Sequence, residues 1–96
     1  MTEYGYIVFY VTTANGSVPL GNAEINISAN KVHMHAKSNT DGHCRPIPFT
    51  FDSQSKSILL GSAVISLNGY IPLVLDRVII CKNVTTVRIV NLDRIL

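Results

Sequence analysis

The chain has little charge of either sign and no run of basic residues. Only 15% of its 96 residues are Asp, Glu, Lys or Arg, and the formal net charge at pH 7 is +2. Binding of nucleic acids and attraction to anionic membranes both depend on clustered positive charge, so we expect neither partner. No apolar run approaches the roughly 18 residues that span a bilayer, which argues against insertion into a membrane.

Tryptophan is absent and cysteine is scarce. Cys44 and Cys81 form no metal-binding or redox motif. The sequence is compatible both with two free thiols and with one disulfide, because the redox state of the compartment decides whether cysteines pair. The first residues, MTEYGYIVFY, have an acid where a secretory signal would have lysines. This predicts synthesis in the cytoplasm without a signal peptide.

Short segments rich in β-branched and aromatic residues fill the chain and are separated by turn signals. Alternating or apolar patterns predict strands over residues 4–13, 22–29, 32–37, 59–67, 73–75, 78–81 and 84–92. Asn15-Gly16, Asn30-Lys31 and Gly42 provide the turns between the early strands. Short strands at this spacing predict one all-β sandwich domain covering residues 1–96.

The same alternation predicts which side chains enter the core. The inward-facing set comprises Ile7, Phe9, Val11, Ala23, Ile25, Ile27, Val32, Met34, Ala36, Ala63, Ile65, Leu67, Val78 and Ile80. Pro46 and Pro48 predict an irregular edge segment that holds Ile47 and Phe49, because proline cannot donate to a ladder. Residues 52–57 are the most polar stretch and predict a mobile loop.

Four short motifs occur in order along nearly the whole chain: VPLGNAEINI at 18–27, TDG at 40–42, GYIP at 69–72 and VNL at 90–92. Together they resemble the carboxypeptidase regulatory-like domains, in particular modules of clostridial cell-wall and spore-associated proteins. The resemblance implies a seven-stranded Greek-key, transthyretin-like (Ig-like) β-sandwich. The chain departs from this pattern at Arg77 and Asn83, where such modules often have glycine.

Neither a metal nor a catalytic site is expected. His33 and His35 lie two residues apart on a predicted strand and face the same side, which gives at most two ligands. With His43 they could bind a transition metal, but the sequence fixes no third ligand. No serine lies in a strand-to-helix turn and no Cys–His–acid set is specified, so we expect a protein that is not an enzyme and needs no cofactor.

The first predicted strand carries an unusual outer face. If Ile7, Phe9 and Val11 enter the core, then Tyr6, Val8 and Tyr10 form an apolar and aromatic stripe that faces outward. Such stripes mark partner surfaces, although a covering loop would also explain one. Ile79, opposite in phase to Val78 and Ile80, adds a second outward position. We therefore predict partner binding through Tyr6, Val8, Tyr10 and Ile79.

These features and the resemblance lead to a hypothesis about function. We expect a non-catalytic structural or adhesive module that packs against other protein subunits, in an assembly such as a phage virion, a phage tail or a spore layer. The alternative is a cell-wall or carbohydrate-binding module of a bacterial surface protein, with peptidoglycan or another glycan as ligand. A transthyretin-like hydrolase is the distant third.

Overall fold

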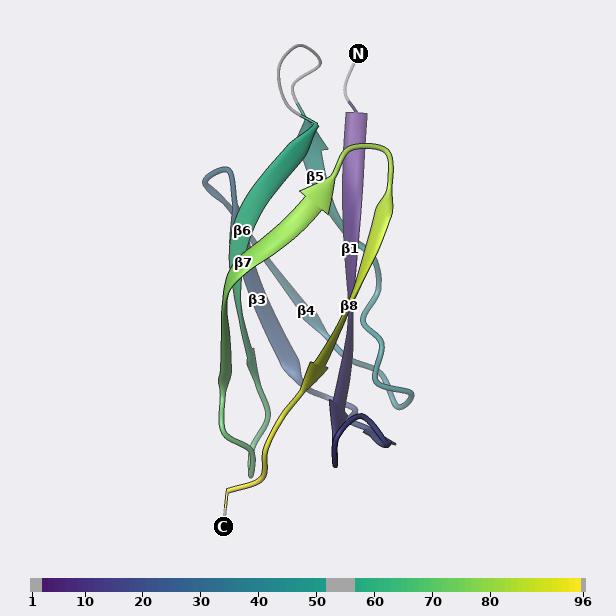
Figure 1. Cartoon of the computed structure of the whole chain (residues 1–96), viewed down its shortest axis with the longest axis vertical. Coiled ribbons are helices and arrows are strands. Elements are labelled where there is room, and N and C mark those ends of the chain that lie inside the picture. The colour runs from purple at the N-terminus through teal and green to yellow at the C-terminus, as the bar shows by residue number, and fades with distance from the viewer. Residues whose placement is uncertain (1–2, 52–56, 96) are drawn as a thin grey trace.

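The computed structural model describes residues 3–51 and 57–95, which form strands, turns and loops but no helix (Figure 1). The strands are β1 (Glu3–Thr13), β2 (Val18–Pro19), β3 (Glu24–Ala29), β4 (Val32–Lys37), β5 (Ile47–Phe51), β6 (Ile58–Ser66), β7 (Leu73–Cys81) and β8 (Thr85–Asn91). The molecule is elongated, 48 × 21 × 18 Å. The start of β1 and the segment that follows β8 lie toward opposite ends of the long axis (Figure 1).

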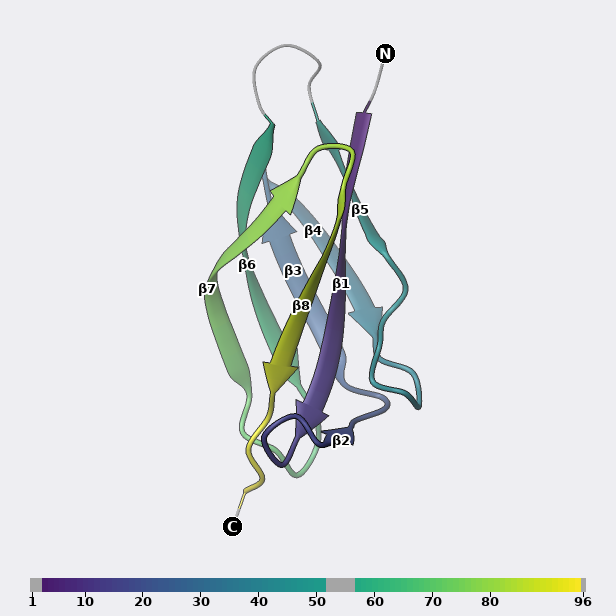
Figure 2. The ribbon, with the colours of Figure 1, turned by 45° about the vertical axis from the view of Figure 1, so that its right-hand side comes forward.

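The first sheet, called sheet A, is built around β1. On one side β1 pairs in parallel with β8, from Tyr6↔Thr85 to Thr12↔Asn91. On the other side it pairs antiparallel with β5 near its start and with the short β2 near its end. Figure 2 shows β1 and β8 running side by side in the same direction. Strand β1 is therefore the central strand of sheet A, with β8 on one side and β5 and β2 on the other.

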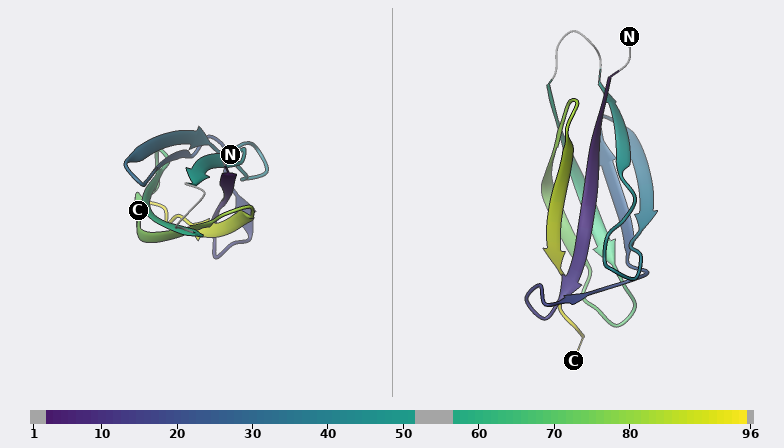
Figure 3. Two further views of the ribbon diagram at one scale, coloured as in Figure 1. Left: turned by 90° about the horizontal axis from the view of Figure 1, so that it is seen from above. Right: turned by 90° about the vertical axis from the view of Figure 1, so that its right-hand side faces the viewer.

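The second sheet, sheet B, has the strand order β4-β3-β6-β7 and is antiparallel throughout. A tight turn joins β3 to β4, with Asn30 and Lys31 at φ 50° and 63°. Positive φ at both central residues gives a hairpin turn whose twist matches that of the strands. Seen from the end, the two sheets curve around a common interior (Figure 3), which is the packing of a β-sandwich.

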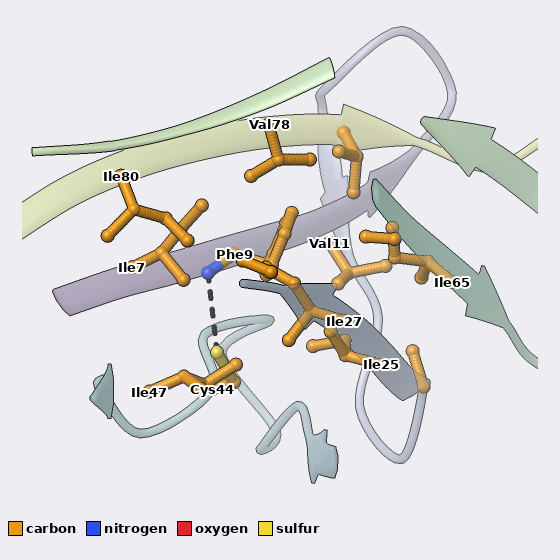
Figure 4. Close-up of a cluster of buried hydrophobic side chains, with 14 of the residues drawn as sticks. Ile7, Phe9, Val11, Ile25, Ile27, Cys44, Ile47, Ile65, Val78 and Ile80 are labelled. Carbon is orange, nitrogen blue, oxygen red and sulfur yellow. Dashed lines mark hydrogen bonds between the residues drawn. The ribbon is translucent and has the colours of Figure 1, made fainter. Parts of the chain in front are cut away.

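The core lies between the two sheets and matches the main sequence prediction. Ile7, Phe9 and Val11 from β1 are fully buried, as are Ile25, Ile27, Ile65, Val78 and Ile80 from sheet B, each at most 1% exposed. Figure 4 shows these side chains gathered between the sheets. The alternation along β1, β3, β6 and the end of β7 therefore identified the core positions.

Four predicted core residues, on β4 and just after β6, are less buried than predicted. Met34, Ala36 and Leu67 are only half-buried, and Val32 is 44% exposed. The prediction that Val32 lies in the core was wrong, because β4 is an outer strand and Val32 stands at its first position, next to the turn.

One predicted irregular segment is a regular strand. The segment with Pro46 and Pro48 does not run as an irregular edge, since Ile47–Phe51 is a regular strand with Ile47, Phe49 and Phe51 buried. Pro48 is exposed and pairs with Tyr6, and β5 is an edge strand where a missing N–H is tolerated. The predicted loop at residues 52–57 falls almost wholly outside the described residues.

The predicted break at Asp76-Arg77 is a bulge within one continuous strand. The register of β6 with β7 shifts between Gly61↔Val78 and Ala63↔Leu75, so β7 has one extra residue there. A bulge twists and bends its strand. Both charged side chains are exposed and β7 continues on either side of them.

The turn after β7 is tied to the start of β1. Asn83, at φ 63°, donates its N–H to Tyr4 O at 2.8 Å and its side-chain amide to Glu3 at 2.9 Å. The hydrogen bond from Asn83 and the charge of Lys82, 3.4 Å away, hold the pKa of the Glu3 carboxyl below its usual value. This turn joins the two sheets at one end of the molecule.

Candidate partner-binding face

The predicted stripe on β1 lies on the outer face of sheet A. Tyr6 is 36% exposed, and Val8 and Tyr10 are half-buried, while Ile7 and Phe9 between them are fully buried. Tyr4 continues the stripe toward the start of the strand and is 44% exposed. Strand alternation accounts for all of these orientations.

Strand β8 extends this surface beyond the residues that the sequence identified. In the parallel ladder Val8 is paired with Val87 and Tyr10 with Ile89, so these side chains lie on the same face of the sheet. Val87 is 58% exposed and Ile89 66%. We call the combined surface the tyrosine face; its members are Tyr4, Tyr6, Val8, Tyr10, Val87 and Ile89.

Val87 and Ile89 could not be assigned to this surface from the sequence, because alternation distinguishes the two faces of β8 without telling which strand lies beside it. The sequence does contain a clue, because the polar residues Thr86 and Arg88 alternate with the apolar residues Val87 and Ile89, and the polar ones occupy the inward positions. That phase is inverted relative to an ordinary sandwich strand, in which polar residues face out.

Aromatic contacts order the tyrosine face. The rings of Tyr4 and Tyr6 are stacked, with centroids 6.2 Å apart. Tyr10 stacks on His43, with centroids 4.4 Å apart and 22° between the planes. The His43 ring therefore covers part of Tyr10, which explains why this tyrosine is less exposed than Tyr4.

His43 is itself held in place by a neighbouring carboxylate. Its N–H donates to Asp41 Oδ1, and its Nδ1 lies 3.2 Å from the same oxygen. These hydrogen bonds from His43 hold the pKa of the Asp41 carboxyl below its usual value. The turn at Asn39–His43 thus acts as a fixed rim beside the tyrosine face.

Ile79 does not join the tyrosine face. It lies on the outer face of sheet B, 48% exposed and paired with Leu60, which is 61% exposed. The adjacent pair Ile58↔Cys81 adds a further exposed isoleucine. The structure therefore separates the four predicted partner-binding residues into two surfaces on different sheets.

The other histidines have separate partners. His33 Nδ1 lies 2.8 Å from Ser28 Oγ, and His35 Nε2 lies 3.2 Å from Glu24 Oε1. All four side chains are on the outer face of sheet B, and His43 belongs to the loop before β5. Within residues 3–51 and 57–95 no group of three or more His, Cys, Asp or Glu is placed to hold a metal ion.

The two cysteines are free and differ in environment. Cys44 is buried in the core and its sulfur accepts the Phe9 N–H at 3.3 Å (Figure 4). Burial raises the pKa of the Cys44 thiol, because the thiolate would lose its solvation. Cys81 is half-buried at the end of β7.

This difference predicts selective thiol labelling. In the native protein a neutral disulfide reagent should modify about one thiol per chain, at Cys81, because reaction requires an accessible thiolate. Cys44 should react only in denaturant. Mass spectrometry of the labelled peptides measures both sites, and the variant Cys81→Ser is the control that should remain unlabelled. Rapid native labelling of Cys44 would contradict the burial described above.

Comparison with known protein families, with curated proteins and with solved structures finds no match to this chain. In the described part of the chain there is no helix that could cross a membrane.

Proposed function

We propose that this chain is a non-catalytic structural module that packs through its tyrosine face against other subunits of a larger protein assembly. The proposal includes the finer fold expected from the sequence, a Greek-key, transthyretin-like sandwich of the carboxypeptidase regulatory-like kind. A phage virion, a phage tail or a spore layer is the setting that this resemblance favours.

One observation carries the proposal: the outer face of sheet A is apolar over two adjacent strands. The outer face of a sandwich strand is ordinarily polar. The outer face of sheet B follows that rule on β3, with Glu24, Asn26 and Ser28, and on β4, with His33, His35 and Lys37. On sheet A, Val87 and Ile89 are among the most exposed large hydrophobic side chains of the described residues, as are Leu60 and Val74 on β6 and β7 of sheet B. Contiguous apolar surface rimmed by polar residues marks a protein interface.

Tyrosine is well suited to such an interface. Its ring buries a large apolar area while its hydroxyl keeps a polar contact, and it has few rotatable bonds to order on binding. Tyr4, Tyr6 and Tyr10 supply three such rings, two of them already stacked on each other. The face is therefore largely preorganised, which lowers the entropic cost of association.

The proposal predicts the effect of placing charge on this face. The double variant Tyr6→Lys, Tyr10→Lys should abolish association through the face, because two ammonium groups would have to lose their hydration on burial. Sedimentation velocity at increasing protein concentration measures this: the wild type should form larger species as its concentration rises, and the variant should not form them. Circular dichroism should show an unchanged fold.

The matched control is Asn26→Lys with Ser28→Lys, which adds the same charge to the polar outer face of sheet B. It should assemble like the wild type. A wild-type protein that stays monomeric or dimeric at every concentration, with the double variant behaving identically, would refute the proposal.

A second candidate function rests on a different place in the fold. A surface hollow beside the turn after β6 is lined by Asn22, Glu24, Asn68 and Tyr70, among others. Amide and carboxylate groups next to an aromatic ring are suited to a sugar, and Arg94 lies 6.0 Å from the Tyr70 ring centre. Binding to purified peptidoglycan that is lost in Asn68→Ala and kept in the tyrosine double variant would favour this glycan-binding function.

A further inference from the structure

Strand β8 has one edge that pairs with no other strand in the described part of the chain. At the two ends of its ladder with β1, Tyr6 N–H donates to Val84 O and Leu92 N–H donates to Thr12 O. A parallel ladder uses alternate residues of each strand. Thr85, Val87, Ile89 and Asn91 therefore point their N–H and C=O groups away from β1, toward the open edge.

The other edge strands carry features that discourage pairing. Strand β5 contains Pro48, and β4 contains two histidines and ends on Lys37. Strand β7 has the bulge at Asp76-Arg77. Charges, prolines and bulges are the usual means by which sheet edges avoid joining other chains. Among the residues of β8 that face the open edge there is no charge, no proline and no bulge.

The one charged side chain of β8 is turned away from the outer surface. Arg88 is paired with the fully buried Phe9, so it lies on the inward face, and it is half-buried. Its guanidinium donates to the carbonyl oxygen of Arg77 at 3.2 Å. This hydrogen bond holds the Arg88 side chain against β7.

Apolar side chains are left partly uncovered on the same side of the molecule. Strands β7 and β8 separate beyond their shared turn (Figures 1 and 2) and come together again where Ile71 N–H donates to Asp93 O at 2.8 Å. Near the turn the inward-facing Val78 and Ile80 are fully buried, whereas Leu73 and Leu75, at the start of β7, are only half-buried. A strand added beside β8 would remove part of this apolar surface from water.

We propose that β8 of one molecule pairs antiparallel with β8 of a second copy, so that two A sheets join into one continuous sheet. The occupant of the open edge must be a strand whose own edge is free and uncharged, and β8 itself meets this requirement. Such a contact is self-complementary around a two-fold axis, the commonest symmetry of homodimers. The inference extends the proposed function, because it would bring the tyrosine faces of two copies side by side.

Charge restricts the register of this pairing. A pairing centred on Arg88 would place two arginines opposite each other, which is destabilising. The neighbouring registers with the same hydrogen-bonding phase place Val87 or Ile89 on the two-fold axis. In either of them the exposed valine and isoleucine side chains of both copies meet at the centre of the joined sheet.

The test replaces a backbone donor that only the second copy would use. Val87→Pro removes an N–H that faces the open edge and none that bonds to β1, so the sandwich should fold and the dimer should be lost. Val87→Thr keeps the N–H and the strand propensity and should remain a dimer. Sedimentation velocity of the purified full chain measures the state of each variant.

A cross-linking experiment tests the pairing of β8 with β8 even if the proline variant does not fold. In a Cys81→Ser background, either Val87→Cys or Ile89→Cys should form a disulfide-linked dimer under mild oxidation, because a residue on the axis faces its own copy at about 5.5 Å between Cα atoms. Val74→Cys, exposed on the outer face of β7, is the control and should remain monomeric. Absence of the linked dimer at both β8 positions, or a wild type that is monomeric, would overturn the inference.

The experiments can refute the tyrosine-face interface and the β8 pairing independently of each other. If β8 pairing is right and the tyrosine face is not an interface, the protein stops at a dimer and the tyrosine double variant changes nothing. If the tyrosine face associates without β8 pairing, the tyrosine double variant still abolishes association, but neither Val87→Cys nor Ile89→Cys forms the linked dimer.

Discussion

Replacing Phe9 by alanine is expected to lower the free energy of unfolding by about 3–5 kcal/mol. Phe9 is fully buried and is the largest such side chain among the described residues. It lies between the two sheets in the middle of β1 (Figure 4), so the cavity left by the ring cannot be filled from solvent-facing side chains. The free energy of unfolding of native domains is only about 5–15 kcal/mol, so this single substitution would remove a large part of the stability of the domain.

Urea denaturation followed by circular dichroism measures this loss. Leu60→Ala is the control: it also removes a large apolar side chain, but Leu60 is 61% exposed, and the expected change is within about 0.5 kcal/mol. Equal losses for the two variants would mean that β1 is not at the centre of the core.

Replacing Gly5 by alanine should also destabilise the fold strongly, for a different reason. A Cβ atom at this position would collide with the carbonyl oxygen of Cys81 and lie 2.7 Å from a ring carbon of Phe51. The carbonyl belongs to the backbone of β7 and cannot rotate away, so the start of β1 must separate from β7. Overpacking of this kind costs about 1–3 kcal/mol, and more where the backbone must move.

Gly21→Ala is the matched control, since its added Cβ would come no closer than 3.1 Å to any neighbouring atom. Thermal unfolding should place Gly5→Ala well below both Gly21→Ala and the wild type. Equal midpoints for the two alanine variants would contradict the close approach of β1 and β7 at this end of the molecule.

The core could be predicted from the sequence because it depends on local alternation. Along β3 the pattern Ile25, Asn26, Ile27 gives buried, half-buried and buried positions, as a two-residue period requires. The turns were equally accessible, since Asn30 and Asn83 both adopt the positive φ that asparagine tolerates. Both features depend on residues that are close together in the sequence, so they can be predicted from the sequence alone.

Strand partners could not be predicted in the same way. Nothing in residues 4–13 indicates that their neighbour is the parallel strand β8, because that pairing is decided by the packing of the whole sandwich. The stripe of Tyr6, Val8 and Tyr10 was visible as a pattern, but its extension by Val87 and Ile89 became visible only once β1 and β8 lay side by side. Ile79 is separate from this surface because β7 belongs to the other sheet. This too could not be predicted without knowing which strands pair.

The two prolines before and within β5 misled the prediction for a physical reason. Proline argues against a central strand, and from sequence alone an edge strand and an irregular segment look the same. Pro48 occupies a position of β5 that is exposed, while its neighbours Ile47 and Phe49 are buried. Burial of those neighbours is sufficient to keep the strand regular.

The pairing of β1 with β8 also constrains how the protein is made. Thr13 Oγ1 donates to Leu92 O across 79 positions of the chain, so sheet A depends on contacts of very long sequence separation. Such contacts slow folding, because a long loop must close before they form. On the ribosome β1 emerges before β8, and it cannot form its parallel ladder until β8 has been synthesised. During that interval only β2 and β5 can pair with β1. Its edge toward β8 stays unpaired and part of its apolar and aromatic surface stays exposed, which favours aggregation of the incomplete chain.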